Sequence, residues 1–394
     1  MSTIAVAGLT RTDFAGIREI LSDEFRPYAG RTETVARMVA ACTVTTVIVM
    51  TFRLPYAFLG VFYAFVISRQ KPEWIVHNGF SAVAASAAAV VYVAMGVQLF
   101  YDYEVLHFVF LAFTLYLVFY LKRALTNDSV TFGFGVTATV ALTLIWDRPY
   151  PAETHLASTF SLSFVVALGT LVAMAVAWVA LQLHPTGRAV RSEGTSAAQS
   201  SPPLLVSDAF SNQEYARFAL KGCFAGLLCY IVDSSVAWPV IMGACAETCI
   251  VSARPLSPGA GTRNERLFVS VTALIVGGIV FGFGSHGLLL PFVDSIIGFI
   301  LQFAVIAALA AWVATSSPRL SYAGTLGAMG FFFPMVTGFA PNPRLARSGA
   351  FFVDLVLALL AFWLVLDRAA DPEASSPANP HSSPPVPLAI PIQH

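Results

Sequence analysis

The sequence predicts an all-α membrane protein with about twelve transmembrane helices in two parallel six-helix repeats. Hydrophobic residues make up 57% of the chain and charged residues only 11%, whereas a soluble domain carries about 25% charged residues. The apolar residues gather in runs of the length that a membrane span needs, about twenty residues. A pattern of arginine, apolar run and proline occurs at 31–72 and again at 214–255. These observations together predict a duplicated helical bundle in a bilayer.

The predicted spans form two sets of six, on either side of a segment rich in Ser, Pro and Gly. The first set lies at 34–52, 54–68, 77–98, 105–121, 129–146 and 157–182, and the second at 215–234, 237–253, 267–284, 292–314, 321–338 and 346–367. Because each set contains an even number of spans, both halves have the same orientation. A rotation about the membrane normal should therefore superimpose them.

Corresponding elements of the two sets share local features. The first span of each set opens on Ala-Arg, at Arg37 and Arg217, and the second begins at a proline, at Pro55 and Pro239. The fifth span of each set is rich in glycine and ends in a loop that contains proline. Proline costs little at the first position of a helix, so Pro55 and Pro239 could simply mark helix starts. Alternatively, the short spans that they open line a transport site.

Three segments outside the spans complete the organisation. Residues 1–30 carry apolar side chains at helical spacing in a charged stretch, which is typical of a helix lying in the membrane interface. The linker 184–212 and the tail 369–394 are rich in Ser and Pro and offer no apolar face to bury. We therefore expect 31–183 and 213–368 to be the two folded halves, and the linker and the tail to lack a fold of their own.

The placement of positive charges predicts the orientation in the membrane. With a cytoplasmic N-terminus, about seventeen Lys and Arg residues lie on the cytoplasmic side and about four on the outer side. Cytoplasmic loops of membrane proteins carry such an excess, so both termini should be cytoplasmic. The N-terminal stretch shows no secretory signal, and insertion should rely on the first span.

The segment from Arg31 to Pro72, and the segment from Arg217 through Ala311-Trp-Val-Ala-Thr to Ser321-Tyr-Ala-Gly, resemble the fusaric acid resistance family, also called aromatic acid exporters. The resemblance covers nearly all of the membrane part. It implies an inner-membrane efflux protein for aromatic carboxylates and other amphipathic toxins, often working with a periplasmic adaptor and an outer-membrane channel. Longer members of that family carry a large soluble domain after each six-span set, where this chain has a short linker and a short tail.

The sequence lacks the motifs of an enzyme and of an ATP-driven pump. It contains no Gly-Lys-Ser/Thr phosphate loop, no His-Glu pair of a zinc protease and no Gly-x-Ser-x-Gly turn. Its five cysteines lie inside apolar runs, which suggests neither disulfides nor a zinc site. We therefore expect no cofactor, no metal ion and no nucleic-acid partner, and a proton gradient as the energy source for any pumping.

Two carboxylates inside the spans are the candidates for proton coupling. Glu247 lies near the middle of the eighth span and Asp354 midway along the last. An ionised carboxylate is costly at that depth, so the neutral form persists to higher pH, as a proton carrier requires. The alternatives are structural: Glu247 would pair with a neighbouring cation such as Lys221, and Asp354 would hydrogen-bond to a neighbouring helix.

Three basic residues are the candidates for attracting substrate at the cytoplasmic mouth. Arg37 and Arg217 lie one turn inside matched helices, and Lys221 follows Arg217 by four residues on the same helix face. Facing the space between the halves, they would concentrate anionic substrates; alternatively, the arginines reach to the lipid headgroups. Phe331 to Phe333 could stack on an aromatic ligand, whereas His107 is expected to be an interface group near the outer end of its span.

These features favour a secondary, proton-coupled exporter of aromatic or amphipathic organic acids. One alternative is a passive organic-anion channel built from the same repeats, since plant malate channels look like distant relatives; another is a membrane scaffold or sensor. The two deep carboxylates favour the exporter, because an anion channel gains nothing from acidic groups in its path. The expected partners are small organic anions, membrane lipids and an adaptor with an outer-membrane channel, and the expected location is the bacterial inner membrane.

Overall fold

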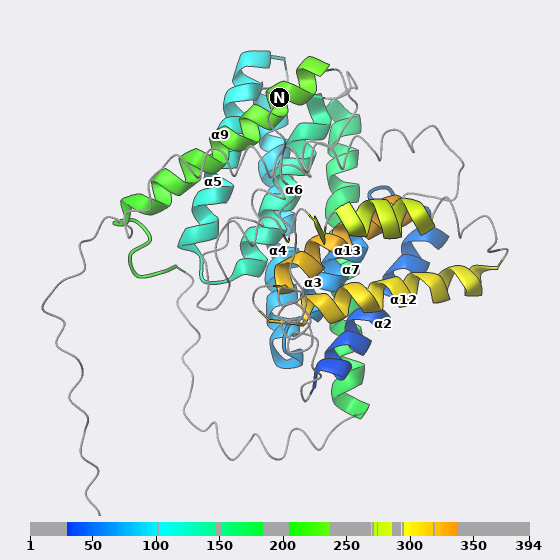
Figure 1. The fold of residues 1–394 in the computed structure, drawn as a ribbon. Coiled ribbons are helices and arrows are strands. Elements are labelled where there is room, and N and C mark those ends of the chain that lie inside the picture. The colour runs from blue at the N-terminus through cyan, green and yellow to red at the C-terminus, as the bar shows by residue number, and fades with distance from the viewer. Residues whose placement is uncertain are drawn as a thin grey trace, which may run out of the picture.

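The computed structural model describes residues 30–100, 102–146, 152–183, 205–236, 275–285, 295–317 and 320–336, with a few single residues between these ranges. This part of the chain is helical and contains no strand. Its elements, shown in Figure 1, are α2 (Arg31–Thr51), α3 (Ala57–Ser68), α4 (Pro72–Phe100), α5 (Glu104–Ala124), α6 (Asp128–Trp146), α7 (Ala152–Leu183), α9 (Gln213–Val236), the π-helix η1 (Val276–Phe283), α12 (Ile296–Ala314) and α13 (Ser321–Val336).

Each of the six ranges predicted as spans before the linker coincides with a helix, α2 to α7. After the linker, α9, α12 and α13 occupy the seventh, tenth and eleventh predicted ranges, and η1 lies within the ninth. The eighth and twelfth ranges, and with them Pro239, Glu247 and Asp354, lie outside the described residues. So do the N-terminal segment 1–29 and the tail.

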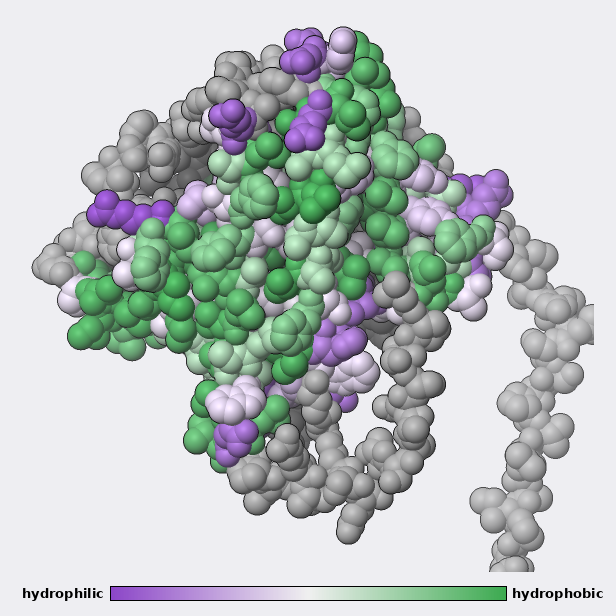
Figure 2. All heavy atoms as spheres, turned by 180° about the vertical axis from the view of Figure 1, so that it is seen from behind, coloured by the Kyte–Doolittle hydropathy of each residue, from purple (hydrophilic) through white to green (hydrophobic). Residues whose placement is uncertain are grey.

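By length and composition, five of the described helices could cross a bilayer: Arg31–Thr51, Trp74–Phe100, Glu104–Ala124, Glu153–Leu183 and Ile296–Ala314. Large apolar side chains face outward on them, among them Met95, Phe164 and Trp178. Figure 2 shows a face dominated by hydrophobic residues, with hydrophilic ones mainly at its margins. Soluble monomers rarely expose apolar surface of this extent. The helices therefore support a multi-pass membrane protein.

Helix α3 is enclosed on all sides. Eleven of its twelve residues are buried, because α2, α4, α7 and α13 pack around it. A helix that is hydrophobic all round requires such a central place. At about 1.5 Å per residue α3 is only about 18 Å long, which is shorter than the roughly 30 Å hydrocarbon core of a bilayer.

Pro55 lies in the turn between α2 and α3 and is exposed. The residues around it, Arg53 and Tyr56, have φ angles of 50° and 57°. Non-glycine residues adopt this left-handed conformation at a cost of order 1–3 kcal/mol, so the turn is strained. Pro55 therefore belongs to the connection that precedes α3 and does not interrupt a helix. Whether the short helix after it lines a transport site stays a prediction.

Glycines let the helices around α3 approach closely. A Cβ atom on Gly169 of α7 would overlap the backbone carbonyl of Gly60 on α3. A Cβ atom on Gly133 of α6 would lie 2.5 Å from the carbonyl oxygen of Ala82 on α4. Backbone atoms cannot move aside as the end of a flexible side chain can, so these positions require the absence of a side chain.

We expect Gly169→Ala to destabilise the bundle by about 1–3 kcal/mol, the usual cost of overpacking. The measurement is the midpoint of thermal unfolding of the purified protein in detergent. Gly79→Ala is the matched control, because a Cβ atom there would meet the flexible side chain of Met174. If both variants shift the midpoint equally, the backbone contact between α3 and α7 does not limit stability.

Helices that follow the linker pack on those that precede it in reciprocal pairs. Helix α2, the first of its set, packs against α12, which occupies the fourth predicted span of the second set. Helix α9, the first of the second set, packs against α5, the fourth of the first (Figure 1). The third and fifth elements also pair within both sets, α4 with α6 and η1 with α13. A two-fold relation between the halves would require such pairings, and the duplication itself stays a prediction.

The end of the predicted linker is docked on α5. The backbone N–H of Val206 donates to the carbonyl of Ala124 at 2.9 Å, and the hydroxyl of Tyr120 donates to the carbonyl of Ala209 at 2.7 Å. Residues 205–212 of the linker are therefore held against α5, and the expectation that the linker lacks a fold of its own stays a prediction. The rest of the linker lies outside the described residues.

Candidate functional site

One face of α3 carries two aromatic rings and an arginine in line. Phe58, Phe65 and Arg69 are separated by seven and four residues, a spacing that places them along one side of a helix. Arg69 is the residue directly after the end of α3. We call these three residues the α3 stripe.

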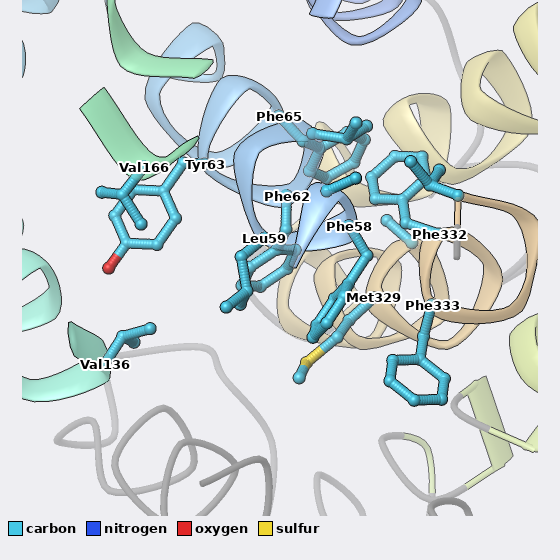
Figure 3. Close-up of a cluster of buried hydrophobic side chains, with 14 of the residues drawn as sticks. Phe58, Leu59, Phe62, Tyr63, Phe65, Val136, Val166, Met329, Phe332 and Phe333 are labelled. Carbon is cyan, nitrogen blue, oxygen red and sulfur yellow. The ribbon is translucent and has the colours of Figure 1, made fainter. Parts of the chain in front are cut away.

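The α3 stripe packs against α13, which belongs to the second set of helices. The ring of Phe58 meets that of Phe333 edge to face at a centroid distance of 4.9 Å, and Phe65 meets Phe332 edge to face at 5.7 Å. Figure 3 shows these rings approaching one another from the two helices. Phe332 also stacks on Phe303 of α12 at 5.5 Å. All five rings are buried, and each such pair contributes about 0.5–1.5 kcal/mol beyond its buried area.

Arg69 ends the α3 stripe in a polar contact with the start of α13. Its Nη1 donates to the hydroxyl oxygens of Ser321 at 3.0 Å and Thr325 at 3.1 Å. The side chain is half-buried. A carboxylate forms shorter and stronger bonds with a guanidinium than a neutral oxygen does. The contact between Arg69 and α13 is thus chemically suited to an organic anion.

Arg31 holds the last turn of α12 on the start of α2. Its side chain is only 1% exposed, and Nη2 donates to the carbonyl of Trp312 at 2.6 Å and to the hydroxyl of Ser316 at 2.8 Å. The guanidinium carbon also lies 4.3 Å from the centre of the Trp312 ring, within cation–π range. A cation at this place satisfies the carbonyls of a helix end and offsets the negative end of its dipole.

Arg37 makes a similar contact with the end of α3. Its buried guanidinium donates to the carbonyls of Ser68 at 3.2 and 3.1 Å and of Gln70 at 2.8 Å. Because these bonds lie inside the bundle, Arg37 does not extend to the lipid headgroups. Arg31 and Arg37 lie near the start of α2, and Arg69 lies at the end of α3. These two helix ends are adjacent, because Arg37 bonds to the end of α3. We call this end of the bundle the basic end.

The other predicted basic residues lie on α9, the helix that packs against α5. Arg217 is exposed there and Lys221 is half-buried. Arg37 is bonded to the end of α3 and Arg217 is not enclosed, so these two residues make different kinds of contact. A role for Arg217 and Lys221 in handling substrate stays a prediction.

Arg31 and Arg69 are the site residues that sequence reasoning missed, because it treated them only as charges that orient the chain. The spacing from Phe58 to Arg69 was an available signal, since it places them on one face of α3. Nothing local in the sequence indicates which helix lies opposite that face.

The fold and these contacts define a multi-pass helical membrane protein with an aromatic and basic interface between its two sets of helices. The chain is similar to the multidrug resistance protein MdtO of Shigella flexneri, with 36% identity over 124 residues. This match covers 32% of the chain and 18% of that protein. The MdtO proteins of Escherichia coli O157:H7 and Escherichia coli strain K12 match with 36% identity over 124 residues, 17% of each.

The match therefore spans less than a fifth of the length of these relatives. No family model matches the chain, and no solved structure does.

Proposed function

We propose that the chain is a secondary efflux transporter for aromatic and other amphipathic organic acids, driven by protons. The observation that carries the proposal is the α3 stripe and its contact with α13, where paired aromatic rings end at Arg69. An aromatic acid joins a ring to a carboxylate and so matches both parts of this interface. The similarity to a protein named for multidrug resistance supports export in general.

The described arrangement is closed to such a substrate, because Phe58 and Phe65 are covered by Phe333 and Phe332. A substrate ring that entered between α3 and α13 would replace these ring contacts with its own. Its carboxylate would replace hydroxyl oxygens as the acceptor of the Arg69 bonds, a stronger charge-assisted interaction. Separation of the two helices is then the step that admits the substrate, and repacking of their rings is the step that closes the path.

Proton coupling is assigned to Glu247, with Asp354 as the second candidate. Each carboxylate would be neutral in its span until it meets water or a cation, and release of its proton would create a costly charge there. A rearrangement of the helices that gives this charge access to water would tie proton release to transport. Arg217 and Lys221 would attract anionic substrates to the mouth of the path.

The proposed setting is the bacterial inner membrane, with the basic end and both termini in the cytoplasm, because positive residues accumulate on that side. The halves 31–183 and 213–368 would be related by a rotation about the membrane normal. A periplasmic adaptor and an outer-membrane channel are the proposed protein partners.

Everted membrane vesicles test this function. We expect them to accumulate a radiolabelled aromatic acid against its gradient when their interior is acidic, and to lose the accumulation when the pH gradient is dissipated. The uncharged amide of the same acid is the matched control and should accumulate less. Uptake that only equalises the concentrations and ignores the pH gradient would indicate a passive anion channel, and uptake equal to that of vesicles without the protein would refute transport of this class.

A further inference from the structure

The segment that carries Arg69 is held by α2. The guanidinium of Arg37 donates to the carbonyl of Ser68 from Nε at 3.2 Å and from Nη2 at 3.1 Å, and Nη2 also donates to the carbonyl of Gln70 at 2.8 Å. Ser68 and Gln70 are the residues on either side of Arg69. The planar donor group of one arginine therefore grips the backbone on both sides of another arginine.

A closed ring of hydrogen bonds holds the same segment from the side of α4 and α6. The side chain of Gln70 accepts a bond from the amide of Asn78 on α4 and donates to the hydroxyl of Ser129 on α6 at 3.2 Å. Asn127, in the connection before α6, closes the ring. Its amide nitrogen donates to Asn78 at 3.2 Å, and its side-chain oxygen accepts from the backbone N–H of Ser129 at 3.0 Å. The backbone that carries Arg69 is thus tied to α2, α4 and α6, which are helices of the first set.

The carbonyls that Arg37 contacts would otherwise work against an anion at Arg69. The last carbonyls of a helix lack partners within the helix and form the negative end of its dipole. Ser68 is the last residue of α3 and Arg69 follows it directly, so a carboxylate bonded to Arg69 would meet the field of that negative end. The positive charge of Arg37 offsets this field, because its guanidinium lies against the oxygens that create it.

We propose that Arg37 is a positioning residue for the binding of an organic carboxylate. It fixes the backbone of Arg69 so that the Arg69 guanidinium faces α13, and it offsets the negative end of α3 without itself contacting the substrate. The bonds of Arg37 are a property of the fold, whereas this role in substrate binding rests on the proposed function. Direct attraction of substrate by the charge of Arg37 is the competing role, and it would not require Arg69.

Uptake of the aromatic acid and of its uncharged amide into everted vesicles tests the role. Arg37→Gln should raise the KM for the acid by about threefold to tenfold, the effect of a typical hydrogen bond. It should leave the KM for the amide unchanged, because the amide brings no carboxylate to Arg69. Loss of folded protein, by contrast, lowers the maximal rate of both compounds and changes neither KM. Lys122→Gln is the control and should change neither KM, since it removes a buried cation that joins α5 to α6 by its ion pair with Asp128.

The dependence on Arg69 separates positioning from direct attraction. In a chain that already carries Arg69→Gln, adding Arg37→Gln should change the KM for the acid little, because residues that act through one another are not additive. An unchanged KM in Arg37→Gln alone, or an equal rise in both backgrounds, would overturn the proposal. Arg37→Lys keeps the charge but not the planar donor group and should recover only part of the affinity. Full recovery would assign the effect to charge alone.

A second measurement needs neither substrate nor a gradient. The midpoint of thermal unfolding of the purified full chain in detergent is compared for Arg37→Gln, Arg69→Gln and the double variant. If Arg37 holds Arg69 against Ser321 and Thr325, the double variant loses less than the sum of the two single losses, and additive losses would contradict the positioning. Arg37→Lys replaces Arg37→Gln in both measurements if the latter does not fold. Absence of uptake by the native chain together with non-additive losses would refute the proposed function and leave the positioning of Arg69 standing.

Discussion

Glu247→Gln should abolish gradient-driven efflux and leave substrate binding intact. Glutamine reproduces the shape and neutrality of a protonated carboxyl group but cannot release a proton, so the step that couples transport to the gradient is lost. In everted vesicles, accumulation of the aromatic acid should fall to the level of vesicles without the protein. Exchange of labelled for unlabelled substrate, which needs no net proton movement, should continue.

Asp354→Asn is the matched control for this variant, because it removes the other deep carboxylate with equally little change of shape. We expect it to reduce accumulation less than Glu247→Gln does. If Glu247→Gln accumulates substrate at the normal rate, Glu247 has a structural role and coupling lies elsewhere.

Arg69→Gln should reduce transport of an aromatic acid by about tenfold or more and leave transport of its uncharged amide nearly unchanged. A hydrogen bond to a charged group contributes about 1.5–3 kcal/mol, which corresponds to about a 10- to 100-fold change in affinity. The initial rates of uptake of acid and amide measure the effect side by side. Arg69→Lys keeps the charge but not the planar donor group, so it should recover only part of the loss.

Arg53→Gln is the control, because Arg53 is an exposed arginine in the turn at the other end of α3. It should not change the ratio of acid to amide transport. An equal loss of both activities in Arg69→Gln would mean that Arg69 only joins α3 to α13 through Ser321 and Thr325.

The positions of the described helices could be predicted because they depend on local composition. Apolar runs of span length set where α2 to α7 occur, and the strained turn around Pro55 separates α2 from α3 as the proline suggests. The linker shows the limit of this reasoning. Its composition gave no sign that Val206 and Ala209 would bond to α5, because the partners of those bonds lie on another helix.

The site could be predicted only in part, for the same reason. The bond from Arg31 to the Trp312 carbonyl joins residues 281 positions apart, and that from Arg69 to Ser321 joins residues 252 apart. A single sequence does not show which helix faces which across such distances. Phe332 and Phe333 could be recognised as aromatic residues suited to stacking, but not as the partners of rings on α3.

Burial was the other property that local patterns could not supply. An arginine near the start of a span, such as Arg37, can extend to the lipid headgroups or turn into the bundle. The sequence does not show that the carbonyls at the end of α3 are within reach of its guanidinium. His107 lies close to a predicted span end, yet it is buried, and α4, α6 and α9 pack against its helix. In both cases the surroundings of the side chain are set by other helices.

A cross-link between α3 and α13 tests most directly the central claim that substrate passes between these helices. Phe65→Cys and Phe332→Cys are combined in a chain whose five native cysteines are replaced. In the native chain the ring centroids of Phe65 and Phe332 lie 5.7 Å apart, so a short cleavable thiol cross-linker should reach between the two positions. The two single variants, treated in the same way, are the controls. We predict that the cross-linked protein loses accumulation of the aromatic acid and regains it when the linker is cleaved. Accumulation at the same rate with and without the cross-link would contradict the account.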